Sequence, residues 1–243
     1  MSGATDEAAG VGVGAAAPLR QRLLAEFLGT ALLLATVVGS GIMGVALSGG
    51  NDGIALLANA GATAAILFVL IVVLGPVSGA HFNPVVTLAA RFDRGLGNRE
   101  AAAYIALQLI GAVAGVLLAH AMFGQALWQP GEHARTGLGQ WLSEAVATFG
   151  LVLVIQLGAR CKPEAVAALV AAYIFAAYWF TASTSFANPA VTLARALTAS
   201  FSGIRPGDVL AFVLAQGLGA AGGWATARGL VPAGRRRVRS SRG

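Results

Sequence analysis

The chain has 243 residues, of which 57% are hydrophobic and 11% charged, and its mean hydropathy is +0.75. A soluble domain carries about 25% charged residues, so this composition excludes an ordinary soluble protein and indicates a membrane protein. The net charge of +6 does not indicate nucleic-acid binding. No aromatic residues alternate with the basic residues near the C-terminus, and most other basic residues lie between apolar segments.

The two ends of the chain differ in composition from the rest. Residues 1–18 are rich in alanine and glycine and lack the basic segment that precedes the apolar core of a cleavable signal peptide. We predict a flexible cytoplasmic tail there, a membrane domain over residues 19–230, and a basic cytoplasmic tail over residues 231–243. The single cysteine, Cys161, cannot form an intrachain disulfide and has no metal-ligand spacing around it, so we expect no metal and no cofactor.

Six segments are apolar and long enough to cross a bilayer, which needs about 20 residues. In chain order they are residues 19–43, 53–74, 101–123, 138–157, 165–184 and 208–230.

Two further apolar segments, residues 81–91 and 188–200, are too short to cross. Each contains Asn-Pro at or near its start, where proline suits the beginning of a helix because its missing N–H would be unpaired there. Non-helical backbone at membrane depth must be buried in protein or line a water-filled cavity. We therefore predict two re-entrant half-helices that line a cavity.

The charges between the six segments give the orientation of the chain. An even number of spans places both termini on one side, and all but three of the sixteen basic residues fall on that side. The exceptions are Arg135, Arg195 and Arg205. The positive-inside rule then predicts a multi-pass protein of the cell (inner) membrane with both termini cytoplasmic.

The two halves of the chain repeat one another. The sequence NPVVTLA at residues 83–89 recurs as NPAVTLA at residues 188–194, with six of seven positions identical. Glu26 and Gln108 in the first half have counterparts in Glu144 and Gln216. Each half, about 19–123 and about 138–230, holds three spans, so the second must insert upside down relative to the first. Inverted repeats with broken helices near the bilayer midplane indicate a transport pathway.

This set of motifs resembles the aquaporin and glycerol-facilitator superfamily, the major intrinsic proteins. The resemblance covers about residues 19–230 and rests on SGAHFNP at residues 78–84, on NPA at residues 188–190, and on the paired Glu26 and Glu144. It implies an all-α membrane protein with six transmembrane helices and two half-helices in an inverted 3+3 repeat. It also implies a homotetramer with one pore per subunit, and a channel, not an enzyme, with no catalytic residues.

The centre of such a pore lies where the two half-helices meet. A half-helix of about 10 residues is about 15 Å long, so two end to end match the hydrocarbon core of about 30 Å. Their N-termini carry about +0.5 elementary charge each, which repels cations. We predict that Asn83 and Asn188 cap the half-helices through their oxygens and point their amide NH₂ groups into the lumen. The predicted pore centre comprises Asn83, Pro84, Val85, Asn188, Pro189 and Ala190.

Glu26 and Glu144 are the acids that lie well inside spans. An intramembrane glutamate is a candidate functional site, and proton relay is one interpretation. A re-entrant loop, however, leaves backbone N–H groups unpaired, and a carboxylate is the strongest acceptor available for them. The resemblance implies this supporting role behind the pore loops. Gln108 and Gln216 are expected to anchor the loops or to make helix contacts.

The resemblance also assigns residues along the lumen. His81 occupies a position that faces the cytoplasmic half of the pore, with a histidine buried in the core as the alternative. Typical members carry Arg directly after the second Asn-Pro-Ala, where this chain has Val191. Counting back from the two asparagines places the rest of the selectivity filter at Thr63, Ala176 and Ser185. All four filter residues are small and uncharged, which predicts a wide filter.

Two features beside this filter have alternative interpretations. Arg195, one helical turn past Val191, either replaces part of the missing charge or pairs with protein groups outside the lumen. The aromatic run at residues 178–180 is expected at the membrane interface, and the alternative is that it narrows the outer mouth.

The sequence thus predicts a passive channel for water and small uncharged solutes such as glycerol-like polyols and urea. The valine after the second Asn-Pro-Ala resembles bacterial aquaporins associated with arsenic detoxification, which adds arsenous acid to the candidates. The alternative function is a coupled secondary transporter built on the inverted repeat, which needs titratable groups in the lumen. A membrane-embedded hydrolase is disfavoured, because Ser40 between two glycines lacks a histidine at matching depth.

Overall fold

The computed structural model describes residues 17–231. Of the predicted tails, only residues 17, 18 and 231 fall within this range, so the tail predictions lie outside the described residues. Within it the chain forms helices and loops without strands, and six helices are long and apolar enough to cross a membrane. These six are α1 Leu19–Leu47, α2 Asp52–Ser78, α4 Asn98–Met122, α5 Leu138–Cys161, α6 Val166–Phe180 and α8 Val209–Leu230. The 3₁₀ turns Pro163–Ala165 and Pro206–Asp208 continue directly into α6 and α8, so these two membrane spans are Pro163–Phe180 and Pro206–Leu230.

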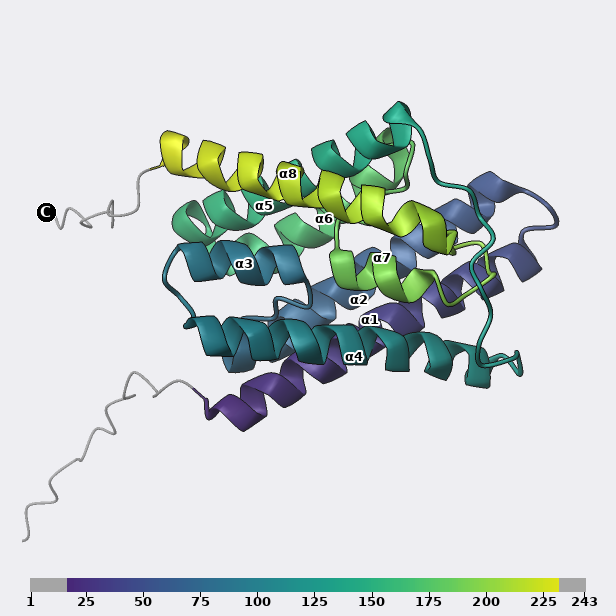
Figure 1. Ribbon diagram of the computed structural model, residues 1–243, viewed down its shortest axis with the longest axis horizontal. Coiled ribbons are helices and arrows are strands. Elements are labelled where there is room, and N and C mark those ends of the chain that lie inside the picture. The colour runs from purple at the N-terminus through teal and green to yellow at the C-terminus, as the bar shows by residue number, and fades with distance from the viewer. Residues whose placement is uncertain (1–16, 232–243) are drawn as a thin grey trace, which may run out of the picture.

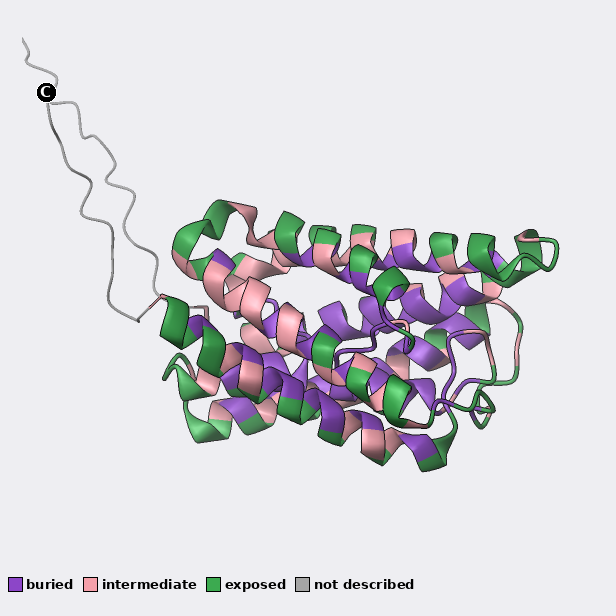
Figure 2. Ribbon diagram, turned by 90° about the horizontal axis from the view of Figure 1, so that it is seen from above, coloured by how far each residue is buried: buried purple, intermediate pink, exposed green. Residues whose placement is uncertain are grey.

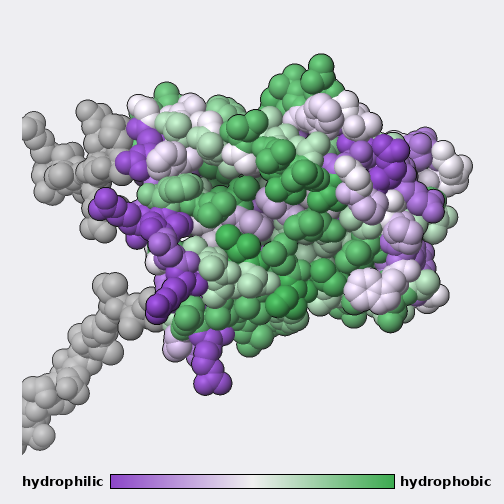
Figure 3. Space-filling view, in the orientation of Figure 1, coloured by the Kyte–Doolittle hydropathy of each residue, from purple (hydrophilic) through white to green (hydrophobic). Residues whose placement is uncertain are grey.

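The helices lie roughly side by side along the longest axis of the molecule (Figure 1). At one end, here called the terminal face, α1 begins, α8 ends, and α3 turns into α4. At the opposite end, here called the loop face, lie the α1–α2 turn and the long connection from α4 to α5. Hydrophilic residues gather at these two ends, and a predominantly apolar band separates them (Figure 3). This pattern is the one expected of a bilayer-spanning bundle.

The predicted inverted repeat is present in the packing. In the first half α1 packs on α4 and α2, and in the second half α5 packs correspondingly on α8 and α6. A side chain on Gly111 or Gly115 would overlap the α1 backbone, and one on Gly219 or Gly223 would overlap the α5 backbone. Small residues at these positions allow close helix approach in lipid. The buried residues lie on the inward sides of the helices (Figure 2).

The two short helices are α3, Pro84–Phe92, and α7, Pro189–Arg195, as the repeated Asn-Pro motif predicts. The second is shorter than predicted, because it ends at Arg195 and not at residue 200. The N–H groups of Ala196 and Leu197 donate to carbonyls three residues back, which tightens and ends the helix. The carbonyl of Arg195 then accepts from Ile204 N at 3.2 Å, and the carbonyl of Ala196 accepts from Gly131 N at 2.9 Å.

Candidate functional site

The two half-helices begin next to one another in the middle of the bundle, and their capping asparagines are cross-linked. Asn83 Nδ2 donates to the Ala187 carbonyl and Asn188 Nδ2 donates to the Phe82 carbonyl, each at 2.8 Å. Each amide therefore uses one of its two hydrogens in a bond to the opposite loop, which leaves the other hydrogen free. Sequence reasoning missed these cross-links, although the matched positions of the two asparagines in the repeat were the available signal.

The amide oxygens cap the half-helices in the predicted way. Asn83 Oδ1 accepts from Val85 N at 3.1 Å. Asn188 Oδ1 accepts from Ala190 N at 3.0 Å and from Val191 N at 3.3 Å. Side-chain capping of this kind satisfies N–H groups that a helix start leaves unpaired.

The loops that lead into the half-helices have a strained backbone. Ala80 and Phe82 in the first loop have φ values of 50° and 48°, and Ser185 and Ala187 at the matching positions of the second have 52° and 47°. The left-handed region costs about 1–2 kcal/mol for each non-glycine residue. Such loops persist only where neighbouring groups hold them in place.

Glu26 supplies such a group for the first loop. Its buried carboxylate accepts from Phe82 N at 2.8 Å and His81 N at 3.0 Å. It also accepts from Ser78 Oγ at 2.6 Å and Gln108 Nε2 at 2.9 Å. All four donors therefore reach one carboxylate behind the loop.

Glu144 makes the equivalent contacts in the second loop. It accepts from Phe186 N and Ala187 N, both at 2.9 Å, and from Gln216 Nε2 at 2.6 Å. Gln216 also donates to Thr192 Oγ1 at 2.8 Å.

The first half contains the matching threonine contact. Gln108 Nε2 donates to Thr87 Oγ1 at 2.9 Å. Each glutamine therefore links a glutamate to a half-helix through a threonine. Sequence reasoning did not single out Thr87 and Thr192, although both lie inside the repeated heptapeptide.

A cavity of about 740 Å³ runs past the two asparagines through the bundle. Asn83, Asn188 and His81 line it, and His81 Nδ1 lies 3.1 Å from Thr87 Oγ1. The other predicted pore-centre residues are buried but are not among the described residues that line the cavity; they are Pro84, Val85, Pro189 and Ala190. Glu26, Glu144, Gln108 and Gln216 are likewise absent from the described lining.

Three of the four predicted filter residues line the loop-face end of this cavity: Thr63, Ser185 and Val191. The assignment of Ala176 is wrong, because this residue is exposed on the outside of α6 and does not line the cavity. The residues of α6 that do line it, Val170, Ile174 and Tyr178, are spaced by four and share one helix face. Ala176 lies two positions from that row and so faces away.

Tyr178 lies beside Thr63 in the cavity lining. Its side chain is 3% exposed, and its hydroxyl lies 3.2 Å from Thr63 Oγ1. The interface prediction for the aromatic run is therefore wrong for Tyr178. Trp179 and Phe180 are exposed on the surface, 49% and 56% respectively.

Two buried arginines contact the second re-entrant loop through the ring of Phe186. Arg195 lines the cavity and places its guanidinium carbon 3.4 Å from the centre of the Phe186 ring. Arg135, in the α4–α5 connection, lies 4.9 Å from the same ring. Burial lowers the pKa of Arg135 to about 10, so its guanidinium is still charged near neutral pH.

Comparison with known proteins agrees with this architecture. The profile of the family described as "Major intrinsic protein" matches residues 15–164. The aquaglyceroporin AqpS of Rhizobium meliloti is 54% identical over 92% of this chain and 95% of its own length. The chain belongs to the major intrinsic protein family.

More distant members of the major intrinsic protein family match parts of the chain. The probable aquaporin AqpM of Archaeoglobus fulgidus is 35% identical over 56% of this chain and 64% of its own length. The X-ray structure of the aquaglyceroporin from Plasmodium falciparum superposes with a TM-score of 0.67 over 87% of this chain and 95% of that one. Sequence identity to it is 17%, so the likeness shows the shared fold.

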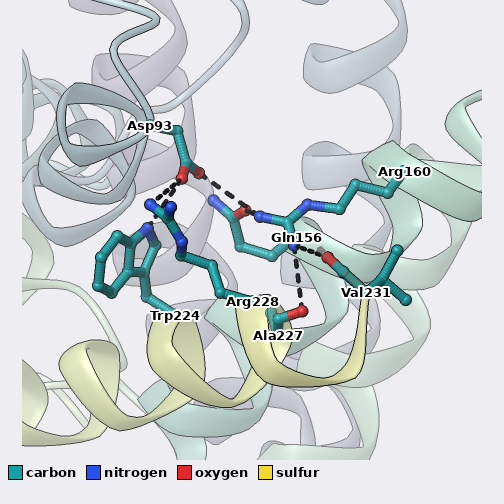
Figure 4. A network of polar contacts seen from close by, with 7 residues as sticks. All are labelled: Asp93, Gln156, Arg160, Trp224, Ala227, Arg228 and Val231. Carbon is teal, nitrogen blue, oxygen red and sulfur yellow. Dashed lines mark hydrogen bonds and ion pairs between the residues drawn. The ribbon is translucent and has the colours of Figure 1, made fainter. Parts of the chain in front are cut away.

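The cavity of this major intrinsic protein opens at the terminal face beside a polar network (Figure 4). Asp93, at the end of α3, accepts from Trp224 Nε1 at 3.1 Å and lies 3.6 Å from Arg228 and 3.9 Å from Arg160. Arg160 also donates to the Val231 carbonyl at 2.6 Å. The network joins α3 to α5 and α8, and the mouth carries more arginines than acids.

Proposed function

We propose that this chain is a passive channel for water and small uncharged solutes, in particular glycerol-like polyols and urea. The observation that carries the proposal is the cavity that passes two half-helices whose capping asparagines each keep one amide hydrogen free. A solute hydroxyl accepts hydrogen bonds from both amides while the two helix N-termini repel cations. Undissociated hydroxides such as arsenous acid belong to the same class of small neutral hydrogen-bonding solutes.

A coupled secondary transporter fits the structure less well. Coupling through the intramembrane acids requires that their carboxylates face the substrate pathway. Glu26 and Glu144 lie behind the loops, and their oxygens are occupied by the loop N–H groups. We propose that both glutamates, with Gln108 and Gln216, support the pore loops and take no part in proton transport.

We further propose that the terminal face is cytoplasmic and that the chain assembles as a homotetramer in the cell membrane. The helix ends and connections at the terminal face carry the arginines at residues 20, 22, 91, 94, 99, 160 and 228 and Lys162. The positive-inside rule then supports the proposed orientation. The tetramer is what the family resemblance implies.

Stopped-flow light scattering of proteoliposomes tests the function. Vesicles with the channel are expected to shrink faster than empty vesicles in sorbitol, and to re-swell in glycerol or urea. A proton or sodium gradient imposed across the membrane should not concentrate any of these solutes. Solute accumulation against its own gradient would establish coupling and overturn the passive channel.

Exchanging a pore-centre asparagine for aspartate is expected to admit cations. In Asn83→Asp and Asn188→Asp the added carboxylate offsets the positive helix termini and also faces a loop carbonyl that accepted a hydrogen bond before. Single-channel or vesicle measurements of K⁺ conductance provide the readout.

Asn51→Asp is the matched control for this exchange. Asn51 caps α2 at the surface by accepting from Ile54 N at 3.2 Å, a role that aspartate fills equally well. Folded pore variants that stay as impermeable to K⁺ as this control would show that the central charge does not exclude cations.

Adding an arginine at the filter is expected to lower the glycerol flux more than the water flux. Val191→Arg fills the loop-face end of the cavity, so glycerol flux should fall about tenfold more than water flux, equivalent to a barrier about 1.4 kcal/mol higher. Ala176→His, which faces outward, should leave the ratio of the two fluxes unchanged. A change of this ratio in Ala176→His, with none in Val191→Arg, would contradict the lining described above.

A further inference from the structure

The loop-face end of the cavity contains a positive charge. The charge comes from Arg195 and not from Val191, the residue directly after the second Asn-Pro-Ala. Val191 is apolar, but Arg195 follows it by one turn of α7 and lines the same cavity. The side chain of Arg195 is 1% exposed. Among residues 17–231 no carboxylate lies within ion-pair distance of it, so this guanidinium is buried without a counter-ion.

Two contacts fix the guanidinium of Arg195 and leave part of it free. Its Nε donates to the Ser202 carbonyl, and its plane lies against the Phe186 ring, 3.4 Å from the ring centre. Its two terminal nitrogens have no hydrogen-bond partner among the described residues. Burying a charge without hydrogen bonds is costly, so these N–H groups require water or solute in the pore.

A second unpaired group lies at the same end of the cavity. Ser185 belongs to the cavity lining, and its hydroxyl is buried without a hydrogen-bond partner within the described chain. The paired hydroxyls of Tyr178 and Thr63 line this end as well. The polar groups share the lining with apolar Ile174 and Val191, so this end presents hydrogen-bonding groups together with apolar surface.

Arg135 has a different arrangement although it contacts the same ring. Its guanidinium donates to the carbonyls of Gly203 at 2.8 Å, Ser183 at 3.2 Å and Phe201 at 3.4 Å. All three bonds hold backbone segments, and Arg135 is not among the described residues that line the cavity. Of the two arginines that contact the Phe186 ring, Arg195 is therefore the one that lines the cavity.

We propose that Arg195 is a specificity-determining residue of the pore, and that with Ser185 and Tyr178 it forms the site at which solutes are selected. It supplies the fixed positive charge from a position one turn beyond Val191. The site accepts neutral solutes whose oxygen atoms receive hydrogen bonds, and it repels cations. Moving the charge by one turn leaves the level of Val191 wide, so the channel passes polyols and still excludes cations. This inference rests on the proposed function.

Charge replacement at residue 195 tests the proposal. The chain has one cysteine, so Cys161→Ser provides a thiol-free background in which Arg195→Cys is the only reactive residue. Methanethiosulfonate reagents then attach ethylammonium or ethylsulfonate through a mixed disulfide, releasing methanesulfinate. Arg205→Cys in the same background is the control, because Arg205 is 47% exposed at the loop face and is not among the described residues lining the cavity.

We expect Arg195→Cys to conduct K⁺ at least about tenfold above background, because about 1.4 kcal/mol of barrier corresponds to that factor. Ethylammonium should suppress this conductance, and ethylsulfonate should raise it. Arg205→Cys should react with both reagents without a change in K⁺ conductance. Water-conducting Arg195→Cys vesicles with no K⁺ leak, or with a leak that neither reagent alters, would overturn the inference.

The second test moves the arginine from residue 195 to residue 191. It can be carried out even if the cysteine variant does not fold. The double variant Val191→Arg with Arg195→Val should exclude K⁺, as the native channel does, while its glycerol flux falls. Arg195→Lys should also exclude K⁺ but should change the ratio of glycerol flux to urea flux. Unaltered solute ratios in Arg195→Lys and a K⁺ leak in the double variant would overturn the inference. A native channel that passes neither water nor glycerol would instead overturn the proposed function.

Discussion

Removal of the Glu144 carboxylate is expected to reduce strongly the yield of folded protein. In Glu144→Ala the N–H groups of Phe186 and Ala187 and the amide of Gln216 lose their acceptor in a buried site. Each unpaired buried donor costs about 1–3 kcal/mol, so three approach the stability of about 5–15 kcal/mol typical of a whole domain. The measurement is the yield of monodisperse protein after detergent extraction, together with its unfolding temperature.

Two further variants make this result interpretable. Glu164→Ala removes an exposed glutamate from the turn before α6 and should behave as the native chain. Glu144→Gln retains one acceptor oxygen but places an NH₂ group next to the donors that the carboxylate bound. Its unfolding temperature should therefore lie between those of Glu144→Ala and Glu164→Ala. If Glu144→Ala unfolds at the temperature of Glu164→Ala, the second loop does not depend on this carboxylate.

A side chain at Gly219 is expected to separate α5 from α8 and to destabilise the bundle. The Cβ of alanine at this position would overlap the carbonyl of Ala145, which is backbone and cannot rotate away. Overpacking of this kind costs about 1–3 kcal/mol, and a β-branched valine adds two further carbons. The thermal unfolding temperature should therefore fall in Gly219→Ala and fall further in Gly219→Val.

Gly217 is the control on the same helix. It is exposed, and a Cβ there would meet no atom within 4 Å. Gly217→Ala should be neutral or more stable by about 0.5–1 kcal/mol, since alanine loses less backbone entropy than glycine in a helix. Equal losses of stability in Gly217→Ala and Gly219→Ala would show that helix propensity, and not close packing, determines the effect.

Much of the fold was predictable because it depends on sequence patterns that occur in both halves of the chain. The apolar segments gave the six membrane helices, and the two Asn-Pro motifs gave the starts of α3 and α7. The paired glutamates lie next to the loops because a carboxylate is the acceptor such loops need. Each of these features follows from local chemistry that recurs in both repeats.

The errors arose where the direction of a side chain in the folded protein, and not the residue type, determines whether it lines the cavity. Counting residues back from Asn188 selected Ala176, but the face that α6 turns to the cavity carries Ile174 and Tyr178. The sequence alone left two interpretations of Arg195, and the position of its guanidinium against Phe186 depends on a loop that returns from Ser202. Counting along a chain does not capture such contacts between distant segments.

The cross-linked asparagines also constrain how the channel is made. The Asn83 amide needs the carbonyl of Ala187, and the carbonyl of Phe82 needs the amide of Asn188, which is synthesised more than one hundred residues later. While the ribosome is still translating α4, the first re-entrant loop has its glutamate but not its partner loop. The pore centre therefore closes only after the second half has inserted with the opposite topology, and neither half contains a finished pore by itself.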